Sequence, residues 1–231
     1  MASMPDTDGH VSDAVQDYAK AIYSLQERFD EAVSTSALAE RLTVSPASAS
    51  AMVKRLESLG LVSRQPYHGV ELTPAGRRVA LEVIRHHRLL ELYLAEALGM
   101  PWDRVHEEAE VLEHAISPEL SELIAAKLGN PTHDPHGDPI PTADGEIEHA
   151  SSRSLDELDT GDEGIFVRIS DSDPEMLRWL SERGIAPGDR LEVLERQPFD
   201  GPLLVRFASG DHALGGALVR MMRIEGSGPR A

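Results

Sequence analysis

Two helix starts constrain the fold of this chain more than any other sequence feature. At each of them a hydroxyl residue is followed directly by a proline, a pair that marks the beginning of a helix. Ser45-Pro46 and Thr73-Pro74 each place a side-chain oxygen at the N-cap and a proline at the first helical position. Gly60 suits the position just after a helix C-terminus. These signals fix where one helix begins and ends, and where the next helix begins.

The segments around that helix predict an ordered set of elements. Apolar residues at helical spacing predict a helix over residues 13–29, and Ser34 offers an N-cap for a short second helix. Residues 61–64 and 70–72 predict the strands of a hairpin, joined by a turn at 66–69. The order helix, helix, short turn, helix, hairpin is that of a winged helix-turn-helix.

In such a unit, the second helix of the turn pair enters the major groove of DNA. Its outer face is small and hydroxylated here, which suits phosphate contacts more than detailed base reading. The alternative role for the same unit is protein docking or dimerisation. The candidate DNA-binding residues are Thr35, Ser36, Ser45, Ala47, Ser48, Ser50, Ala51, Lys54 and Arg55.

The chain is acidic overall, but its charges are segregated. It has 22 Lys+Arg against 40 Asp+Glu, for a formal net charge of −18. Residues 41–88 nevertheless contain 8 basic and 3 acidic side chains, whereas residues 89–163 contain 3 basic and 19 acidic ones. DNA affinity depends on local neutralisation of phosphates, so the basic block favours a DNA partner. The alternative is that these cations only solvate a helix.

The remainder of the chain predicts more helices and then strands. A long helix should run from Pro74 to about residue 97, followed by helices over about 103–117 and 118–128. Residues 129–152 are rich in proline and acidic residues and predict a linker. We interpret His133-x-x-His136 within it as loop polarity.

Beyond residue 152, short apolar alternations predict a small half-open β-barrel. It should contain one helix over 174–183, and its last strand should include Ala217, Val219 and Met221.

Composition excludes several kinds of site. The chain has no cysteine, which rules out disulfides, thiolate zinc fingers, iron–sulfur clusters and cysteine nucleophiles. Any metal must therefore take oxygen and imidazole ligands. No apolar run approaches the roughly 18 residues that span a bilayer, and the first residues lack the pattern of a secretory signal. We expect a soluble, cytoplasmic protein with no membrane partner.

Imidazoles and carboxylates recur at helical spacing in the acidic block, on two helices joined by a short loop. One stripe has the spacing i, i+4, i+7 and i+8, and the preceding helix carries an i, i+4 pair. These ligands suit Mn²⁺, Fe²⁺ or Co²⁺. Alternatively, the glutamates are a solvated face. The stripe is His106, Glu110, Glu113 and His114, and the pair is His87 and Glu91.

Part of this stripe superficially approaches the His-Glu-x-x-His motif of metallohydrolases. The fifth residue is Glu110 and not histidine, and no third ligand follows at protease spacing. A metal-dependent hydrolase with a docking winged helix is the alternative from another class. We assign no catalytic residue and no small-molecule substrate, and expect the protein not to be an enzyme.

In the order and spacing of its motifs, nearly the whole chain resembles the diphtheria-toxin-repressor/manganese-transport-regulator family of metal-activated transcription repressors. The motifs are Tyr18 to Tyr23, Ser45 to Ser50, Gly60-Leu-Val, Leu72 to Arg77, His86 to Glu91, Val105 to His114, and Pro135 to Pro141.

The resemblance implies a mainly α fold with a small β domain, and a homodimer. Its parts are a winged helix-turn-helix over 1–75, a helical metal-binding and dimerisation domain over 76–141, a linker over 142–152, and an SH3-like, FeoA-type β-barrel over 153–228.

The resemblance also implies two metal sites. The primary site takes Asp17, Glu110, Glu113 and His114. In this site Asp17 replaces the Met of iron-responsive members, and Glu110 replaces their Cys. The second site takes His87, Glu91 and His106, with Asp173 from the barrel and Glu175 as a competitor. Lys20 stands where a short manganese-type member has a carboxylate for a closely spaced metal pair, which favours two separated sites.

From these features we expect a homodimeric repressor of metal-homeostasis genes that binds double-stranded operator DNA. Mn²⁺ is the expected activator, at two sites per subunit, and an iron-dependent (Fe²⁺) repressor of the same family is the alternative.

Overall fold

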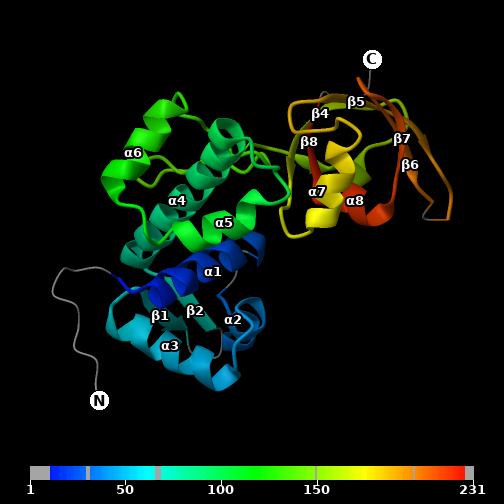
Figure 1. The fold of residues 1–231 in the computed structure, drawn as a ribbon. Helices are drawn as coiled ribbons and strands as arrows, with labels where there is room; N and C mark the ends of the chain where they lie inside the picture. The colour runs from blue at the N-terminus through cyan, green and yellow to red at the C-terminus, as the bar shows by residue number, and fades with distance from the viewer. Residues whose placement is uncertain (1–10, 30–31, 66–68, 149, 200, 227–231) are drawn as a thin grey trace. The chain divides into compact units, whose positions relative to one another are not determined.

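The computed structural model describes residues 11–29, 32–65, 69–148, 150–199 and 201–226. The chain forms two compact units (Figure 1). The first comprises the chain through His86 together with Pro141–Gly145, and the second comprises His87–Ile140 and the chain from Glu146 onward. The four domain ranges expected from the sequence stay a prediction.

The first unit contains the predicted winged helix-turn-helix. The side chains of Ser34 and Ser45 accept hydrogen bonds from the backbone N–H groups of Ala37 and Ser48, so both expected caps are present. Of the turn expected at 66–69, residues 66–68 lie outside the described residues, and Gly69 is the first residue of β2. The elements are α1 (Asp13–Phe29), α2 (Thr35–Arg41), α3 (Pro46–Ser58), β1 (Val62–Gln65), β2 (Gly69–Leu72) and the first part of α4 (Pro74–Leu98).

A small apolar core holds α3 in place and thereby decides which of its faces is exposed. Ala49, Val53 and Leu56 of α3 are buried and pack in one cluster with Ile22 of α1 and Leu38 of α2. Burial at this spacing leaves the opposite, hydroxylated face of α3 exposed. The start of α4 is held by Thr73, whose hydroxyl donates to Gly60 O at 2.7 Å and accepts from Gly76 N at 3.1 Å.

The second unit contains the rest of α4, together with α5 (Val105–Leu112) and α6 (Pro118–Lys127). The expectation of a helix to residue 117 is wrong, because α5 ends at Leu112. Ser117 caps α6 and must be extended before Pro118, which excludes it from a preceding helix.

The expectation of a linker over 129–152 is wrong for its first part. Asp134 accepts hydrogen bonds from the backbone N–H groups of His136 (2.8 Å) and Asp138 (2.9 Å). Ile140 N donates to Thr132 O at 2.8 Å. Aspartates that bond their own backbone favour turns, and here they fold the proline-rich segment into a compact loop.

The β domain has the predicted SH3-like class, with six antiparallel strands in the order β3-β8-β4-β5-β6-β7. The strand expected at 217–221 is instead helix α8, because Leu218, Val219 and Met222 are buried at helical spacing. No strand was expected at the positions of β3, β7 and β8. The elements are β3 (Arg153–Ser154), a 3-10 turn (Leu155–Glu157), β4 (Glu163–Ile169), α7 (Pro174–Ser181), β5 (Arg190–Arg196), β6 (Leu203–Phe207), β7 (Gly210–Leu214), α8 (Gly216–Met221) and β8 (Met222–Glu225).

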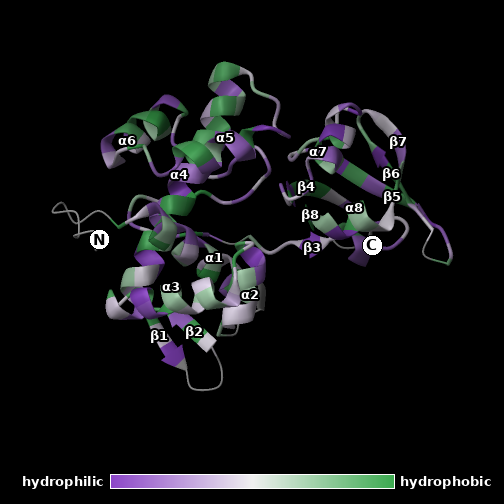
Figure 2. Cartoon of the chain, turned by 60° about the horizontal axis from the view of Figure 1, so that its bottom comes forward, coloured by the Kyte–Doolittle hydropathy of each residue, from purple (hydrophilic) through white to green (hydrophobic). Residues whose placement is uncertain are grey.

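Large apolar residues remain exposed on the helices of the second unit. In Figure 2 the green colour on α5 and α6 marks hydrophobic positions on these helices. Val111 is 73% exposed and Leu123 is 61% exposed, which is unusual for large apolar residues in one region. Leu98, Leu112 and Leu120 belong to the same group. Among the described residues, no helix combines the length and the apolar character that crossing a bilayer requires.

Candidate functional site

The candidate metal centre of the second unit is built around Glu91, in the C-terminal part of α4. Glu91 is 1% exposed, and its Oε1 lies 3.0 Å from Nε2 of His87, one turn earlier on α4. The same oxygen lies 3.2 Å from Nδ1 of His106 on α5. Asp171 Oδ2, from the β4–α7 connection, lies 2.8 Å from that Nδ1. Each of the four residues offers a ligand atom within 4.8 Å of the others.

Glu113 extends this cluster on the other side of His87. Its Oε2 lies 2.6 Å from His87 Nδ1, and its Oε1 lies 3.5 Å from His114 Nε2. Glu110 is more distant and more exposed, with its Oε1 3.9 Å from His87 Nδ1. The turn after α5 therefore brings Glu113 and His114 together, although the helix stops before them.

His136 belongs beside this centre, and the interpretation of it as loop polarity is wrong. The side chain is fully buried, with its Nε2 2.8 Å from the backbone oxygen of Trp102. That contact requires the ring proton on Nε2, because a carbonyl oxygen only accepts. Among the described residues, Nδ1 has no hydrogen-bond partner, and it lies 3.8 Å from Glu91 Oε2. A buried imidazole with one nitrogen fixed and the other free has the arrangement of a metal ligand.

Of the two aspartates in the β4–α7 connection, Asp171 lies against His106, whereas Asp173, the ligand expected from the sequence, is the N-cap of α7. The Asp173 carboxylate accepts hydrogen bonds from the backbone N–H groups of Glu175 (3.0 Å) and Met176 (3.2 Å), so it caps α7. The competitor Glu175 is exposed. The Asp-Pro pair that opens α7 was a usable sequence sign of the cap, but the contact of Asp171 with His106 depends on tertiary structure.

Electrostatics in the cluster keep Glu91 ionised. Burial by itself raises the pKa of Glu91, but His106, His136 and His87 outweigh burial and hold this pKa well below its usual range. Asp171 and Glu91 raise the pKa of His106 to about 10. Burial lowers the pKa of His136, yet the neighbouring Glu91 and Asp134 carboxylates raise it to about 9. The raised pKa values of His106 and His136 favour their protonated forms, whose positive charge offsets the charge of the carboxylates.

A divalent cation fits the same positions. Imidazole nitrogens and carboxylate oxygens without thiolate are ligands for Mn²⁺, Fe²⁺ or Co²⁺. The unpartnered Nδ1 of buried His136 is the observation that supports this fit, since an unsatisfied buried polar atom is destabilising. The cluster can exchange imidazole protons for a metal ion of the same positive charge.

The remaining ligand expected from the sequence, Asp17, lies on α1 in the first unit, as does Lys20. Glu110, Glu113 and His114 belong to the second unit. The composition of the primary site therefore stays a prediction from sequence.

The candidate DNA-binding face is exposed as the sequence predicts. Ala47, Ser48, Ala51, Lys54 and Arg55 of α3 are exposed, and Ser50 is half-buried. Ser45 and Ser48 also share a hydrogen bond of 2.8 Å between their hydroxyls. On α2, Ser36 is exposed and Thr35 is half-buried. Contact of these residues with DNA stays a prediction.

A winged helix-turn-helix in the same chain as a buried imidazole–carboxylate cluster defines a metal-dependent, DNA-binding transcriptional regulator. The family domain described as "Iron dependent repressor, N-terminal DNA binding domain" matches residues 10–70. "Iron dependent repressor, metal binding and dimerisation domain" matches residues 73–142, and "FeoA domain" matches residues 153–226. The chain belongs to this family of iron- and manganese-dependent repressors.

Relatives and solved structures support the assignment. The iron-dependent repressor IdeR of Mycobacterium leprae is 33% identical over 208 residues, which cover 84% of this chain and 88% of that protein. The diphtheria toxin repressor of Corynebacterium diphtheriae is 30% identical over an alignment that covers 92% of this chain and 97% of that protein. A solved structure of a manganese-dependent transcriptional repressor in complex with manganese matches with a TM-score of 0.84 at 45% identity. The match covers 92% of this chain and 100% of that chain.

We expect metal binding to release protons and to strengthen as the pH rises. A pKa of about 10 for His106 means that its ring carries an extra proton at neutral pH, and a metal ligand must lose it. Between about pH 6.5 and pH 8, affinity for Mn²⁺ should rise roughly tenfold per pH unit for each proton released. Calorimetry in buffers of different ionisation enthalpy measures both quantities. Binding that released no proton would contradict the assignment.

We expect Lys54→Ala and Arg55→Ala each to weaken operator binding. Each should lower the slope of log affinity against log salt concentration by about 0.9 if one phosphate contact is lost. Fluorescence anisotropy with operator DNA across a salt series measures the slope. Arg190→Ala, which removes the same charge from β5, serves as the control. An unchanged slope in both α3 variants would exclude this face from the DNA interface.

Proposed function

We propose that this chain is a homodimeric repressor that Mn²⁺ activates for binding to double-stranded operator DNA. The observation that carries the proposal is the convergence of His87, Glu91, His106 and Asp171 in the second unit. Membership of a family of metal-dependent repressors supplies the DNA-binding half of the function.

Ligand type supports manganese over iron. Mn²⁺ binds most weakly in the first-row divalent series, so a site favours it through hard ligands and geometry, not through affinity. The chain has no cysteine, and Asp17 and Glu110 stand where iron-responsive members are expected to carry softer side chains. Every proposed ligand is an oxygen or an imidazole nitrogen.

We assign two sites to each subunit. The second site takes His87, Glu91 and His106, with Asp171 from the β domain in place of Asp173, and His136 as a further ligand. The primary site takes Asp17, Glu110, Glu113 and His114, as the resemblance implies. The hydrogen-bond-length contact between Glu113 and His87 supports communication between the two sets.

The protein's own residues explain why a metal would activate it. The carboxylates assigned to the primary site repel one another without a cation, which opposes the arrangement in which they converge. A bound divalent cation supplies the positive charge that this arrangement requires. Asp17 would then tie the helix α1 of the DNA-binding unit to the dimerisation helices and restrict the orientation of α3, because two half-sites must be met at a set spacing. Operator DNA must in turn tighten metal binding by the same factor.

The exposed apolar surface of the second unit supports a homodimer. Val111, Leu120 and Leu123 are large apolar residues whose exposure in a single chain is unfavourable. They lie on α5 and α6, inside the range matched by a metal-binding and dimerisation domain. A second copy that covers this surface would remove the unfavourable exposure.

The second candidate is an iron-dependent repressor. Relatives at 33% identity carry the name iron-dependent repressor, whereas the solved structures at 45% and 32% identity carry manganese in their names.

We expect Mn²⁺ to promote operator binding at least as well as Fe²⁺ or Co²⁺ at equal occupancy. Zn²⁺ should bind tightly but activate poorly, because its four-coordinate preference leaves some ligands unengaged. Anaerobic fluorescence anisotropy on operator DNA, with metal occupancy determined in parallel, measures the response. Full activation by Fe²⁺ without activation by Mn²⁺ would refute the manganese assignment and support the iron alternative. No gain in DNA affinity with any metal would refute metal activation itself.

The double substitution Asp17→Met with Glu110→Cys should shift the response toward Fe²⁺ and Co²⁺, because it introduces softer ligands. The same anisotropy assay checks this shift. An identical metal preference in parent and variant would remove these two residues from the selectivity-determining site.

Two matched substitutions test which aspartate of the β domain is a metal ligand. Asp171→Asn should weaken Mn²⁺ binding at the second site, because it removes a carboxylate 2.8 Å from His106. Asp173→Asn retains a capping oxygen, so it should leave metal binding unchanged and lower the free energy of unfolding by less than about 1 kcal/mol. Calorimetric titration with Mn²⁺ and chemical unfolding separate the two effects. Loss of metal binding in Asp173→Asn alone would restore the original expectation.

A further inference from the structure

A polar cavity lies in the second unit, and its lining contains none of the proposed metal ligands. Its volume is about 320 Å³, far more than the roughly 30 Å³ of one water molecule. The compact loop contributes His133, Gly137 and Pro139 to its lining, and β4 and β8 contribute Arg168 and Arg223. Ser151 and Ser152 add two hydroxyls to the lining.

The loop wall is held directly against the sheet. A Cβ atom on Gly137 would lie 1.9 Å from Val167 O, so only glycine permits this approach. Ile169 N also donates to His136 O at 2.9 Å. The loop residues that line the cavity are therefore held against β4 by backbone contacts.

The two arginines form a like-charge pair. Arg168 and Arg223 are direct partners in the antiparallel register of β4 and β8, and both side chains line the same cavity. Like charges at directly opposite positions of a sheet are destabilising unless something neutralises them.

The protein supplies little neutralising charge. Arg168 Nη1 lies 3.4 Å from Asp138 Oδ1, but that carboxylate is shared with Arg88 at 3.5 Å. Arg223 has a buried Nε without a hydrogen-bond partner among the described residues. Glu148 lines the cavity and is exposed, and no ion pair joins it to either arginine within the described part of the chain.

We propose that this cavity binds a phosphate-type oxyanion between the guanidinium groups of Arg168 and Arg223. Guanidinium forks match the oxygens of phosphate, and a doubly charged anion neutralises both cations of the pair. The serine hydroxyls can donate to the remaining oxygens. Glu148 opposes the anion and limits its affinity. Free phosphate and the phosphate group of a small monoester share this chemistry.

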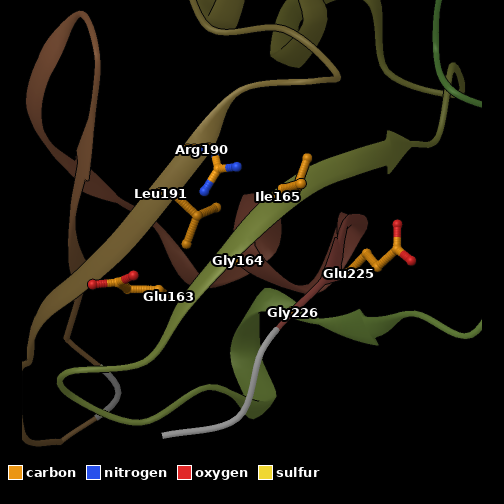
Figure 3. Close-up of a pocket in the computed structure, with 7 residues that line it drawn as sticks. All are labelled: Glu163, Gly164, Ile165, Arg190, Leu191, Glu225 and Gly226. Carbon is orange, nitrogen blue, oxygen red and sulfur yellow. The ribbon is translucent and has the colours of Figure 1, made fainter. Parts of the chain in front are cut away.

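The larger cavity of the β domain does not have this character. It measures about 500 Å³ and is lined by Arg190 between Glu163 and Glu225, together with apolar residues and glycines (Figure 3). Its single cation is outnumbered by carboxylates, so it offers no oxyanion site. Arg190 is therefore a matched control, since it is a strand arginine of the same sheet outside the proposed site.

The test uses the full-length, metal-free chain, so that phosphate cannot bind a metal ion. Inorganic phosphate, glycerol phosphate and acetate are titrated at constant ionic strength, and binding is followed by ¹H–¹⁵N NMR of backbone amides and arginine Nε–H groups. We expect saturable phosphate shifts in β4, β8 and the loop around Gly137. Glycerol phosphate should bind comparably if the site accepts a monoester, and acetate should bind more weakly.

Substitutions of the two arginines and of Glu148 should change the affinity for phosphate in opposite directions. Arg168→Gln and Arg223→Gln should each weaken phosphate binding by about tenfold or more, whereas Glu148→Gln should strengthen it several-fold. Arg190→Gln should leave it unchanged. The proposal is overturned if phosphate produces no saturable shift, or if Arg168→Gln, Arg223→Gln and Glu148→Gln all bind it like the parent chain. The gain expected in Glu148→Gln does not depend on whether an arginine variant folds.

Discussion

One buried negative charge organises the second unit. Glu91 is almost completely shielded from water, yet the neighbouring imidazoles keep its pKa well below the usual range. A buried carboxylate is stable only when positive or hydrogen-bonding partners surround it. Its partners come from three places, because His87 lies on the same helix, His106 on α5, and His136 on the compact loop. The packing of these three segments therefore depends on the charge state of a single site.

The same site is connected to the β domain through several contacts within the second unit. Asp171 reaches His106 from the β4–α7 connection. Trp102 stacks on His136, with ring centroids 5.7 Å apart, and packs against the core of the β domain. Arg178 of α7 binds Asp103 through a pair of hydrogen bonds of 3.1 and 3.0 Å. A change in the ligands of this cluster therefore has a structural route to the β domain.

Segregated charge lets one chain serve two opposite electrostatic needs. A cation site requires carboxylates, and DNA requires cations that neutralise phosphates. Residues 89–163 contain 19 acidic and 3 basic side chains, whereas residues 41–88 contain 8 basic and 3 acidic ones, so each need is met locally. The proposed oxyanion cavity follows the same rule on a smaller scale, because Arg168 and Arg223 form a local positive pair in an acidic protein.

Local signals in the sequence determined the helix starts and the ligand pairs. Ser45-Pro46 and Thr73-Pro74 act through neighbouring backbone groups, and the spacing of His87 and Glu91 places both on one helical face wherever the helix lies. Tertiary structure alone decided that Asp171 faces His106 while Asp173 caps a helix, and that His136 is buried beside Glu91. These positions depend on how segments distant in sequence pack together. Helical periodicity and capping rules describe only what a residue does within its own segment.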